Sequence, residues 1–157
     1  MALPRLRALT PDDRTRVEAM TRAVGLFYDH EIPVALEVFD DSFGDPDYES
    51  AGVEVDGVLV GWACWGPTPA SEGTFDLYWI VVDRGQQGSG LGSLLLEEME
   101  RRTTGRARTF LVETSGRSDY APTRAFYERH GFRQVAVEAG HYGPGDDLVR
   151  FSKTYAN

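Results

Sequence analysis

Residues 75–102, FDLYWIVVDRGQQGSGLGSLLLEEMERR, decide the fold of this chain, because they place a glycine-rich turn between a strand and a helix. The aromatic and β-branched residues 75–82 are typical of a buried strand. Residues 93–102 have apolar side chains on one side of a helical period, which predicts an amphipathic helix. The first N–H groups of a helix lack internal partners and lie at the positive end of its dipole. Because glycines let a phosphate approach this backbone closely, the segment predicts a site for a phosphate-bearing ligand.

The spacing of the glycines separates three kinds of phosphate-binding loop. A dinucleotide-binding loop requires G-x-G-x-x-G, and Ser93 stands where its third glycine should be. A Walker loop requires a lysine after its second glycine, and Leu91 stands at that position. Both mismatches disfavour an NAD- or nucleotide-binding protein. The pattern that remains is Q/R-x-x-G-x-G, formed by Gln87, Gly90 and Gly92.

This loop resembles the acetyl-CoA pyrophosphate loop of the GNAT superfamily of N-acetyltransferases. A second motif supports the resemblance, since residues 124–132, RAFYERHGF, are similar to the family signature F-Y-x-x-x-G-F. Gly131 suits the end of a helix, and Phe132 begins the next predicted strand. The order and separation of the two motifs match the family from residue 75 to residue 132, while the N-terminal half resembles it only in the order of its elements.

One position departs from the family pattern. The family often has asparagine seven residues before the signature tyrosine and alanine four before it, where this chain has Tyr120 and Thr123. That asparagine commonly contacts the pantetheine arm of the cofactor. Either Tyr120 or a water molecule replaces the contact here, or the contact is absent.

Periodicity and turn residues predict an α/β (α+β) fold with the element order β-α-α-β-β-β-α-β-α-β-β, which is that of a single GNAT-type domain over residues 1–157. We expect a central mixed, mostly antiparallel sheet of about seven strands, flanked by about four helices. The predicted strands are 3–9, 53–55, 58–65, 75–82, 108–113, 132–138 and 148–154. The predicted helices are 10–24, 32–43, 93–102 and 120–130, and residues 141–147 are expected to form a turn.

Composition limits the classes of partner. A formal charge of −9 and a pI of about 4.8 argue against nucleic-acid binding. The three histidines lie far apart in the sequence and show no metal-ligand spacing, so no metal is expected. Cys64 is the only cysteine and lies in an apolar strand, which predicts a buried, inert thiol. Without a long apolar run or a signal-peptide pattern, the chain is expected to be soluble and cytoplasmic and to bind no membrane.

The resemblance implies direct attack of a neutral amine on the thioester of acetyl-CoA, without an acyl-enzyme. By the family pattern, the hydroxyl of Tyr127 protonates the leaving thiolate. A backbone N–H of the strand around residues 80–82 would hold the oxyanion, and the free edge of that strand would pair with the pantetheine. The residues expected to bind acetyl-CoA are Ile80, Val81, Val82, Gln87, Gly88, Ser89, Gly90, Leu91, Gly92, Ser93 and Tyr120.

A base is also expected, because presenting a lysine-like amine in its neutral form at pH 7 costs roughly 4.6 kcal/mol. Asp76 is the first candidate, since it interrupts an apolar strand and, by the resemblance, matches the place where histone-acetylating members of the family carry a glutamate base. An aspartate near a frayed strand end, or one paired with arginine, would explain Asp76 equally well. Glu113 is the second candidate, and Glu31 is the third.

The acceptor is expected to be a small-molecule or peptide amine, chosen in this family by the first two helices and the last hairpin. The candidates there are Tyr28, Glu31 and Tyr142. Acidic residues 29, 31, 37, 40 and 41 predict either a rim that attracts a cation or ordinary solvated helix faces. A homodimer is compatible with the resemblance. The alternative function is a non-catalytic module that binds acetyl-CoA or CoA as a sensor or scaffold.

Overall fold

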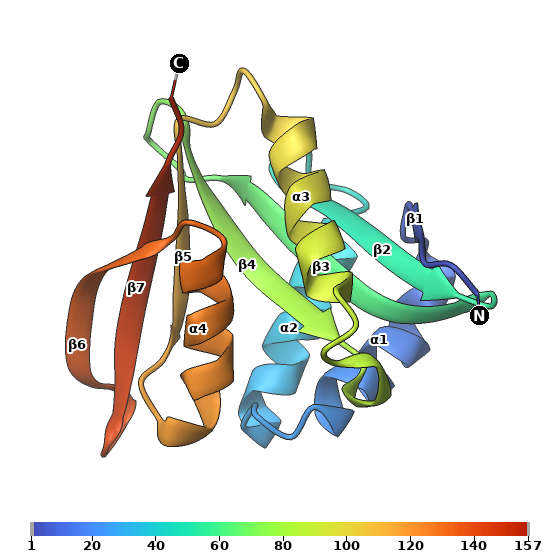
Figure 1. The fold of residues 1–157 in the computed structure, drawn as a ribbon, viewed down its shortest axis with the longest axis horizontal. Coiled ribbons are helices and arrows are strands. Elements are labelled where there is room, and N and C mark those ends of the chain that lie inside the picture. The colour runs from blue at the N-terminus through green and yellow to red at the C-terminus, as the bar shows by residue number, and fades with distance from the viewer. Residues whose placement is uncertain (1, 157) are drawn as a thin grey trace. The chain divides into compact units, whose positions relative to one another are not determined.

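The structure is a computed structural model, and it describes residues 2–156. In this range the α-helices are α1 (Arg14–Ala23), α2 (Ile32–Asp41), α3 (Leu91–Thr103) and α4 (Ala121–Arg129), as Figure 1 shows. The strands are β1 (Arg5–Arg7), β2 (Glu49–Val55), β3 (Val58–Pro67), β4 (Thr74–Val82), β5 (Thr109–Ser115), β6 (Arg133–Gly143) and β7 (Asp146–Thr154). The order of these elements is the predicted one.

The strands form a mixed sheet in the order β1-β2-β3-β4-β5-β7-β6. β4 and β5 are parallel, whereas β1–β2, β2–β3, β5–β7 and β6–β7 are antiparallel pairs. A parallel pair needs a crossover connection, and α3 lies in the connection between β4 and β5. The predicted fold class, an α/β (α+β) fold with a mixed, mostly antiparallel seven-stranded sheet and four helices, is confirmed.

The chain divides into two compact units, and β4 contributes to both. The first unit consists of Met1–Gly66 and Tyr78–Thr104, and the second consists of Pro67–Leu77 and Gly105–Asn157. The division falls inside β4, so the N-terminal part of this strand pairs within the second unit while its C-terminal part leads into the glycine-rich loop of the first.

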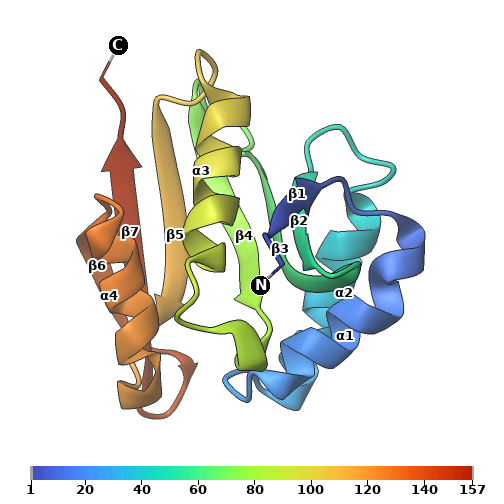
Figure 2. The same cartoon turned by 45° about the vertical axis from the view of Figure 1, so that its right-hand side comes forward.

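Helices cover both faces of the sheet in the first unit, with α3 on one face and α1 and α2 on the other (Figures 1 and 2). β3 is therefore buried without interruption from Leu59 to Gly66, which explains why its sequence is apolar throughout. Trp62 packs in the core formed with α1 and α2. On the other face α3 comes close to the strand, because a Cβ atom at Gly61 would lie 3.1 Å from the Leu95 side chain.

In the second unit α4 packs against β7 (Figures 1 and 2). The ring of Tyr127 on α4 lies 6.0 Å from that of Phe151 on β7, and Val112 pairs with Phe151 on the same face of the sheet. Successive residues of a strand point to opposite faces, so Asp76, Glu113 and Arg150 point away from the face that α4 covers. This unit therefore separates an apolar face from a charged one.

Several predicted boundaries were wrong; for example, β2 begins at Glu49 instead of residue 53. The first strand is limited to Arg5–Arg7 instead of residues 3–9, because the preceding Pro4 has no N–H to donate to a partner strand. The predicted turn over residues 141–147 is short, since Gly143 pairs with Asp146 and only two residues connect β6 to β7. Gly145 has a φ of +75°, the left-handed conformation that such tight hairpins require.

Candidate functional site

The glycine-rich loop between β4 and α3 is attached to the first unit at its start. The Asp83 N–H donates a hydrogen bond to the Val60 carbonyl over 2.7 Å, and the Asp83 carboxylate pairs with Arg16 over 3.1 Å. The Gln87 side-chain amide donates to the Val82 carbonyl over 3.5 Å. These contacts fix the direction in which the chain leaves the strand and enters the loop.

Gly88 and Gly90 adopt left-handed backbone conformations, with φ of +82° and +84°. No atom lies within 4 Å of the position that a Cβ would take at either residue, so packing within the protein does not explain these glycines. The left-handed turn geometry does, and the open space at both positions leaves room for a ligand. Residues 87–90 are exposed to solvent, as an anion-binding loop must be.

The helix after this loop begins earlier than predicted. α3 starts at Leu91, with Gly90 as its N-cap, and its first hydrogen bond runs from the Leu94 N–H to the Gly90 carbonyl over 3.1 Å. Gly92 and Ser93 therefore lie in the first turn, where N–H groups have no partner within a helix and the dipole is positive. Buried Leu91 anchors this turn. The local geometry can bind an anion.

The strand end predicted to contact the cofactor directly precedes this loop. Val81 is buried, whereas Ile80 and Val82 are partly exposed. The structure thus brings the cofactor candidates of residues 80–93 together in the first unit. Tyr120, the remaining candidate, belongs to the second unit: it is the N-cap of α4, is 7% exposed and lies with its ring 5.1 Å from the Arg117 guanidinium.

Tyr127 is buried within the second unit, at 4% exposure. Its ring contacts Phe132 and Phe151, with centroids 5.8 and 6.0 Å apart. Burial, and to a smaller extent nearby Tyr120, raises the pKa of the Tyr127 hydroxyl well above its usual range. A tyrosine hydroxyl is protonated at neutral pH even at its ordinary pKa of 10.0, so Tyr127 has a proton to donate, and the rise makes it a weaker acid.

Asp76 is half-buried on β4, and the Thr68 hydroxyl donates a hydrogen bond of 2.6 Å to its Oδ2 atom. Burial is the main cause that raises the pKa of this carboxyl, and the negative charge of Glu113 adds to it. The hydrogen bond from Thr68 and the charge of Arg150 oppose the rise. A carboxylate with a raised pKa is a stronger base, which suits proton abstraction near neutral pH.

Glu113 lies on the same face as Asp76, because Asp76 is opposite Leu111 and Glu113 follows two residues later. Its carboxylate accepts a hydrogen bond from Arg150 Nη2 over 2.8 Å, across the antiparallel pair β5–β7. This ion pair raises the pKa of the Arg150 guanidinium. The structure thus brings the two predicted bases together on one face and places Tyr127 on the other.

Sequence reasoning missed Thr68 and Arg150. Thr68 stands between two prolines, eight residues before Asp76, and this Pro-Thr-Pro pattern is a signal for a rigid turn that could have drawn attention to it. Arg150 lies 37 residues from Glu113 in the sequence, and only the register of β5 with β7 brings the two together.

The acceptor candidates lie in both units. In the first, the Glu31 carboxylate accepts a hydrogen bond from the Tyr28 N–H over 2.8 Å and so caps the turn before α2. The Tyr28 ring stacks on His30, with centroids 5.4 Å apart. In the second unit, partly exposed Tyr142 lies in β6, near the end of the last hairpin, with its ring against His141.

The predicted acidic rim is spread along α2. Glu31 precedes the helix and Asp41 ends it, ten residues later, which corresponds to about 15 Å. Asp40 pairs with Arg14 over 3.0 Å, so part of the rim is neutralised. Asp29 and Glu31 remain as the acidic pair at the N-terminal end of α2.

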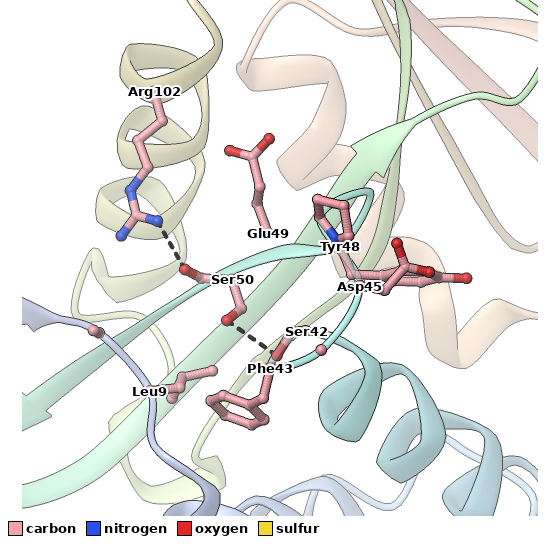
Figure 3. A pocket seen from close by; sticks show the side chains of 11 residues that line it. Leu9, Ser42, Phe43, Asp45, Tyr48, Glu49, Ser50 and Arg102 are labelled. Carbon is pink, nitrogen blue, oxygen red and sulfur yellow. Dashed lines mark hydrogen bonds between the residues drawn. The ribbon is translucent and has the colours of Figure 1, made fainter.

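A pocket of about 540 Å³ lies at the opposite end of α3 from the glycine-rich loop, and it contains none of the predicted site residues. Figure 3 shows its polar groups bonded to one another: Arg102 donates to the Ser50 carbonyl over 2.9 Å, and the Ser50 hydroxyl contacts that of Ser42 over 3.3 Å. The lining residues are Ala8, Leu9, Ser42, Phe43, Gly44, Asp45, Pro46, Tyr48, Glu49, Ser50 and Arg102.

Three further expectations concern groups outside this site. Cys64 is buried, as predicted, and burial raises the pKa of its thiol to about 12, so the thiolate is scarce at neutral pH. Within residues 2–156, no three or more His, Cys, Asp or Glu side chains are grouped so that they could hold a metal ion. None of the helices in the same range combines the length and hydropathy needed to cross a membrane.

Comparison with known proteins gives a consistent result. The sequence profile of the acetyltransferase (GNAT) family matches residues 15–132. The chain is similar to the crystal structure of a GNAT-family protein from Desulfovibrio desulfuricans, with 40% sequence identity and a TM-score of 0.87 over 99% of this chain and 100% of that one. No curated protein matches the sequence at a significant level.

Two more distant structures have the same fold. One is a ribosomal-protein-alanine N-acetyltransferase from Brucella melitensis, with 20% identity and a TM-score of 0.77 over 96% of this chain and 99% of that one. The other is an aminoglycoside 6'-N-acetyltransferase complexed with coenzyme A, with 16% identity and a TM-score of 0.77 over 98% of both chains.

Proposed function

Because the chain belongs to the GNAT family of acetyltransferases, we propose that it transfers an acetyl group from acetyl-CoA to a primary amine. The observation that carries this proposal is the loop before α3, where two left-handed glycines precede the open first turn of a helix. Such a turn binds a pyrophosphate through backbone N–H groups, without needing a basic side chain. A relative of the same fold is complexed with coenzyme A, which supports a CoA thioester as the donor.

The proposed reaction is a single displacement in a ternary complex. A carboxylate takes one proton from the acceptor ammonium, directly or through water, and the neutral nitrogen attacks the thioester carbonyl. A C–N bond forms and the C–S bond breaks, so that the electron pair leaves on sulfur. The hydroxyl of Tyr127 gives its proton to this thiolate, or stabilises it, and regains through solvent the extra proton that the newly acetylated nitrogen releases.

Asp76 is the proposed base, and Glu113 is the alternative. Asp76 is half-buried and accepts a hydrogen bond from a neutral hydroxyl, whereas Glu113 is exposed and pairs with a guanidinium. An ion-paired carboxylate is a weaker base, because a cation stabilises its charged form. Asp76 and Tyr127 lie on opposite faces of the sheet, but the parallel pairing of β4 with β5 ends at Leu77 and Val112, one residue beyond Asp76. We propose that the reacting groups lie at this point, where the two strands no longer pair and a ligand has access to both faces.

We propose that the acceptor is a cationic amine on a small molecule or a peptide. The relatives with this fold include enzymes named for a ribosomal-protein alanine and for an aminoglycoside, and both acceptors present an amine. Tyr28, Glu31 and Tyr142 are the proposed acceptor-binding residues, and Tyr120 is proposed to take the place of asparagine beside the pantetheine. We propose that residues 1–157 form one acetyltransferase domain that works in the cytoplasm, and a homodimer stays a prediction.

A screen of primary amines with detection of the released CoA thiol tests this function. The panel should include polyamines, amino acids, aminoglycosides, peptides with free N-termini and lysine peptides. We expect release of CoA that depends on both acetyl-CoA and one class of amine, with the N-acetyl product visible by mass spectrometry. Binding of acetyl-CoA without acceptor-dependent thiol release across the panel would favour the non-catalytic module instead.

A further inference from the structure

The backbone of Thr68 is fixed by the turn between β3 and β4 through contacts that do not involve its hydroxyl. Its N–H donates to the Thr74 carbonyl over 2.8 Å, and its carbonyl accepts a hydrogen bond of 2.6 Å from the Ser71 hydroxyl. Pro67 and Pro69 on either side restrict the backbone, and the β-branched side chain has few rotamers. The direction of the Thr68 hydroxyl is therefore set by local structure.

That hydroxyl points at Asp76, the carboxylate of the proposed reaction. The Thr68 Oγ1 atom lies 2.6 Å from Asp76 Oδ2, a short hydrogen bond between a neutral donor and an anion. The Thr68 hydroxyl contacts only one of the two carboxylate oxygens, and the other, Oδ1, is the one proposed to face the acceptor. A single fixed donor orients a carboxylate and keeps one oxygen available.

Two charged side chains, one on the adjacent strand β5 and one on β7 beyond it, act on Asp76. Glu113 on β5 lies on the same face of the sheet and disfavours a second negative charge, while Arg150 on β7 favours it. These two side chains pair with each other over 2.8 Å, so their opposite effects on Asp76 partly cancel. Thr68 is then the nearest group that favours the ionised form of Asp76.

We propose that Thr68 is a positioning residue for the acetyl transfer: its hydroxyl holds Asp76 ionised, with one oxygen turned toward the incoming ammonium. This role rests on the proposed function, in which Asp76 takes the proton of the acceptor. The turn of residues 67–74 has a structural role as well, but Thr68 Oγ1 acts on the reaction through Asp76 alone.

The consequence is a defined shift of the pH profile. Removal of the hydrogen bond takes away a contact that favours the charged carboxyl, so the pKa of Asp76 rises further above its usual range. In Thr68→Val, the acidic limb of kcat/KM should move to higher pH by about one unit. Above that limb the carboxyl is ionised again, and the variant should recover to near the wild-type plateau.

Two matched variants separate this role from a structural one. Thr68→Ser keeps the hydroxyl and should keep the wild-type profile. Thr109→Val makes the same replacement on β5 in the same unit, where the hydroxyl contacts Thr154 over 3.2 Å, and should leave the acidic limb in place. A loss of activity in Thr68→Val that is equal at every pH would mean that Thr68 only stabilises the turn, and it would overturn the proposal.

Glu113→Gln gives a test of the opposite sign. It removes the like charge that faces Asp76 and should move the acidic limb to lower pH. Glu113→Gln could instead abolish activity at every pH while Thr68→Val leaves the pH profile of kcat/KM unchanged. In that case Glu113 is the base, and the role proposed for Thr68 is wrong.

Titration of the Asp76 carboxyl carbon by NMR measures the same shift without any acceptor. A pKa of Asp76 that rises in Thr68→Val, in a protein that releases no CoA with any amine, would show that the contact is correct and the proposed function is wrong. Unchanged titration of Asp76 in Thr68→Val would overturn the proposal whatever the acceptor screen shows.

Discussion

The two units carry their candidate groups in different ways. In the first unit the groups belong to the backbone, since Gly88 and Gly90 supply a turn and the start of α3 supplies N–H donors. In the second unit they are side chains whose properties depend on neighbours, as with Asp76 beside Thr68 and Tyr127 among aromatic rings. A backbone site needs only the right turn, so the spacing of the glycines in the sequence predicts it. A side-chain site depends on contacts made across the fold.

The largest expected effect is on the backbone site. Gly90→Val should weaken the binding of acetyl-CoA roughly 100-fold, the effect of losing about two hydrogen bonds to a charged phosphate. Gly105→Val is a matched control, because Gly105 has the same φ of +84° and the same open space around its Cβ position but lies after α3. Calorimetry with acetyl-CoA on both folded variants measures the difference. Equal affinity for the two would remove the loop from the binding site.

The next effect concerns the side-chain site. Tyr127→Phe should lower kcat by about 100-fold, since a positioned general acid supplies about 10²–10⁴ in rate, and should leave the affinity for acetyl-CoA nearly unchanged. Tyr155→Phe removes a hydroxyl elsewhere in the same unit, from a ring that packs on Phe110, and serves as the control. Steady-state kinetics and calorimetry together make the test, and a loss of only a few-fold would indicate that water protonates the sulfur.

The same contrast explains what the sequence could predict. The strand–loop–helix segment follows from local rules, as do the order of the elements and the buried position of Cys64. The contact of Glu113 with Arg150 does not, because it depends on the register of β5 with β7. A shift of that register by one residue would turn Arg150 to the other face. Thr68 is an intermediate case, since the flanking prolines predict a rigid turn but not the direction of its hydroxyl.

A smaller effect on stability should accompany the loss of the carboxylate. The pKa of Asp76 is raised in the folded protein, chiefly by burial, so the folded state holds the proton more tightly than the unfolded state. Stability from this group is therefore lost as pH rises from the ordinary value of 3.8 through the folded pKa. Asp76→Asn keeps an oxygen that accepts from Thr68 and should be more stable than the wild type at pH 7.

Chemical denaturation as a function of pH measures this gain in the free energy of unfolding. The difference between Asp76→Asn and the wild type should shrink as the pH is lowered toward 3.8. The same variant should lose acetyl transfer. Its gain in stability would then come at the cost of activity, a trade-off that is common at functional sites. A variant less stable than the wild type at pH 7 would mean that the ionised carboxylate stabilises the second unit, and burial would not be the dominant influence on Asp76.

The smallest expected effect is on the salt dependence of kcat/KM, and it concerns the first unit, where the side chain of Glu31 rather than the backbone is proposed to act. Attraction of a cationic acceptor by Asp29 and Glu31 should make kcat/KM fall as salt rises, because exposed charges are screened over about 10 Å at 0.1 M salt. Glu31→Gln should flatten this slope while keeping the cap, since the glutamine carbonyl can still accept from the Tyr28 N–H. Glu97→Gln removes the same charge from an exposed position on α3 and should leave the slope unchanged.

If both variants change the slope equally, the effect belongs to the net charge of −9 rather than to a rim. If kcat/KM is independent of salt, or the best acceptor is neutral or anionic, Glu31 has only the structural role that its contact with Tyr28 shows.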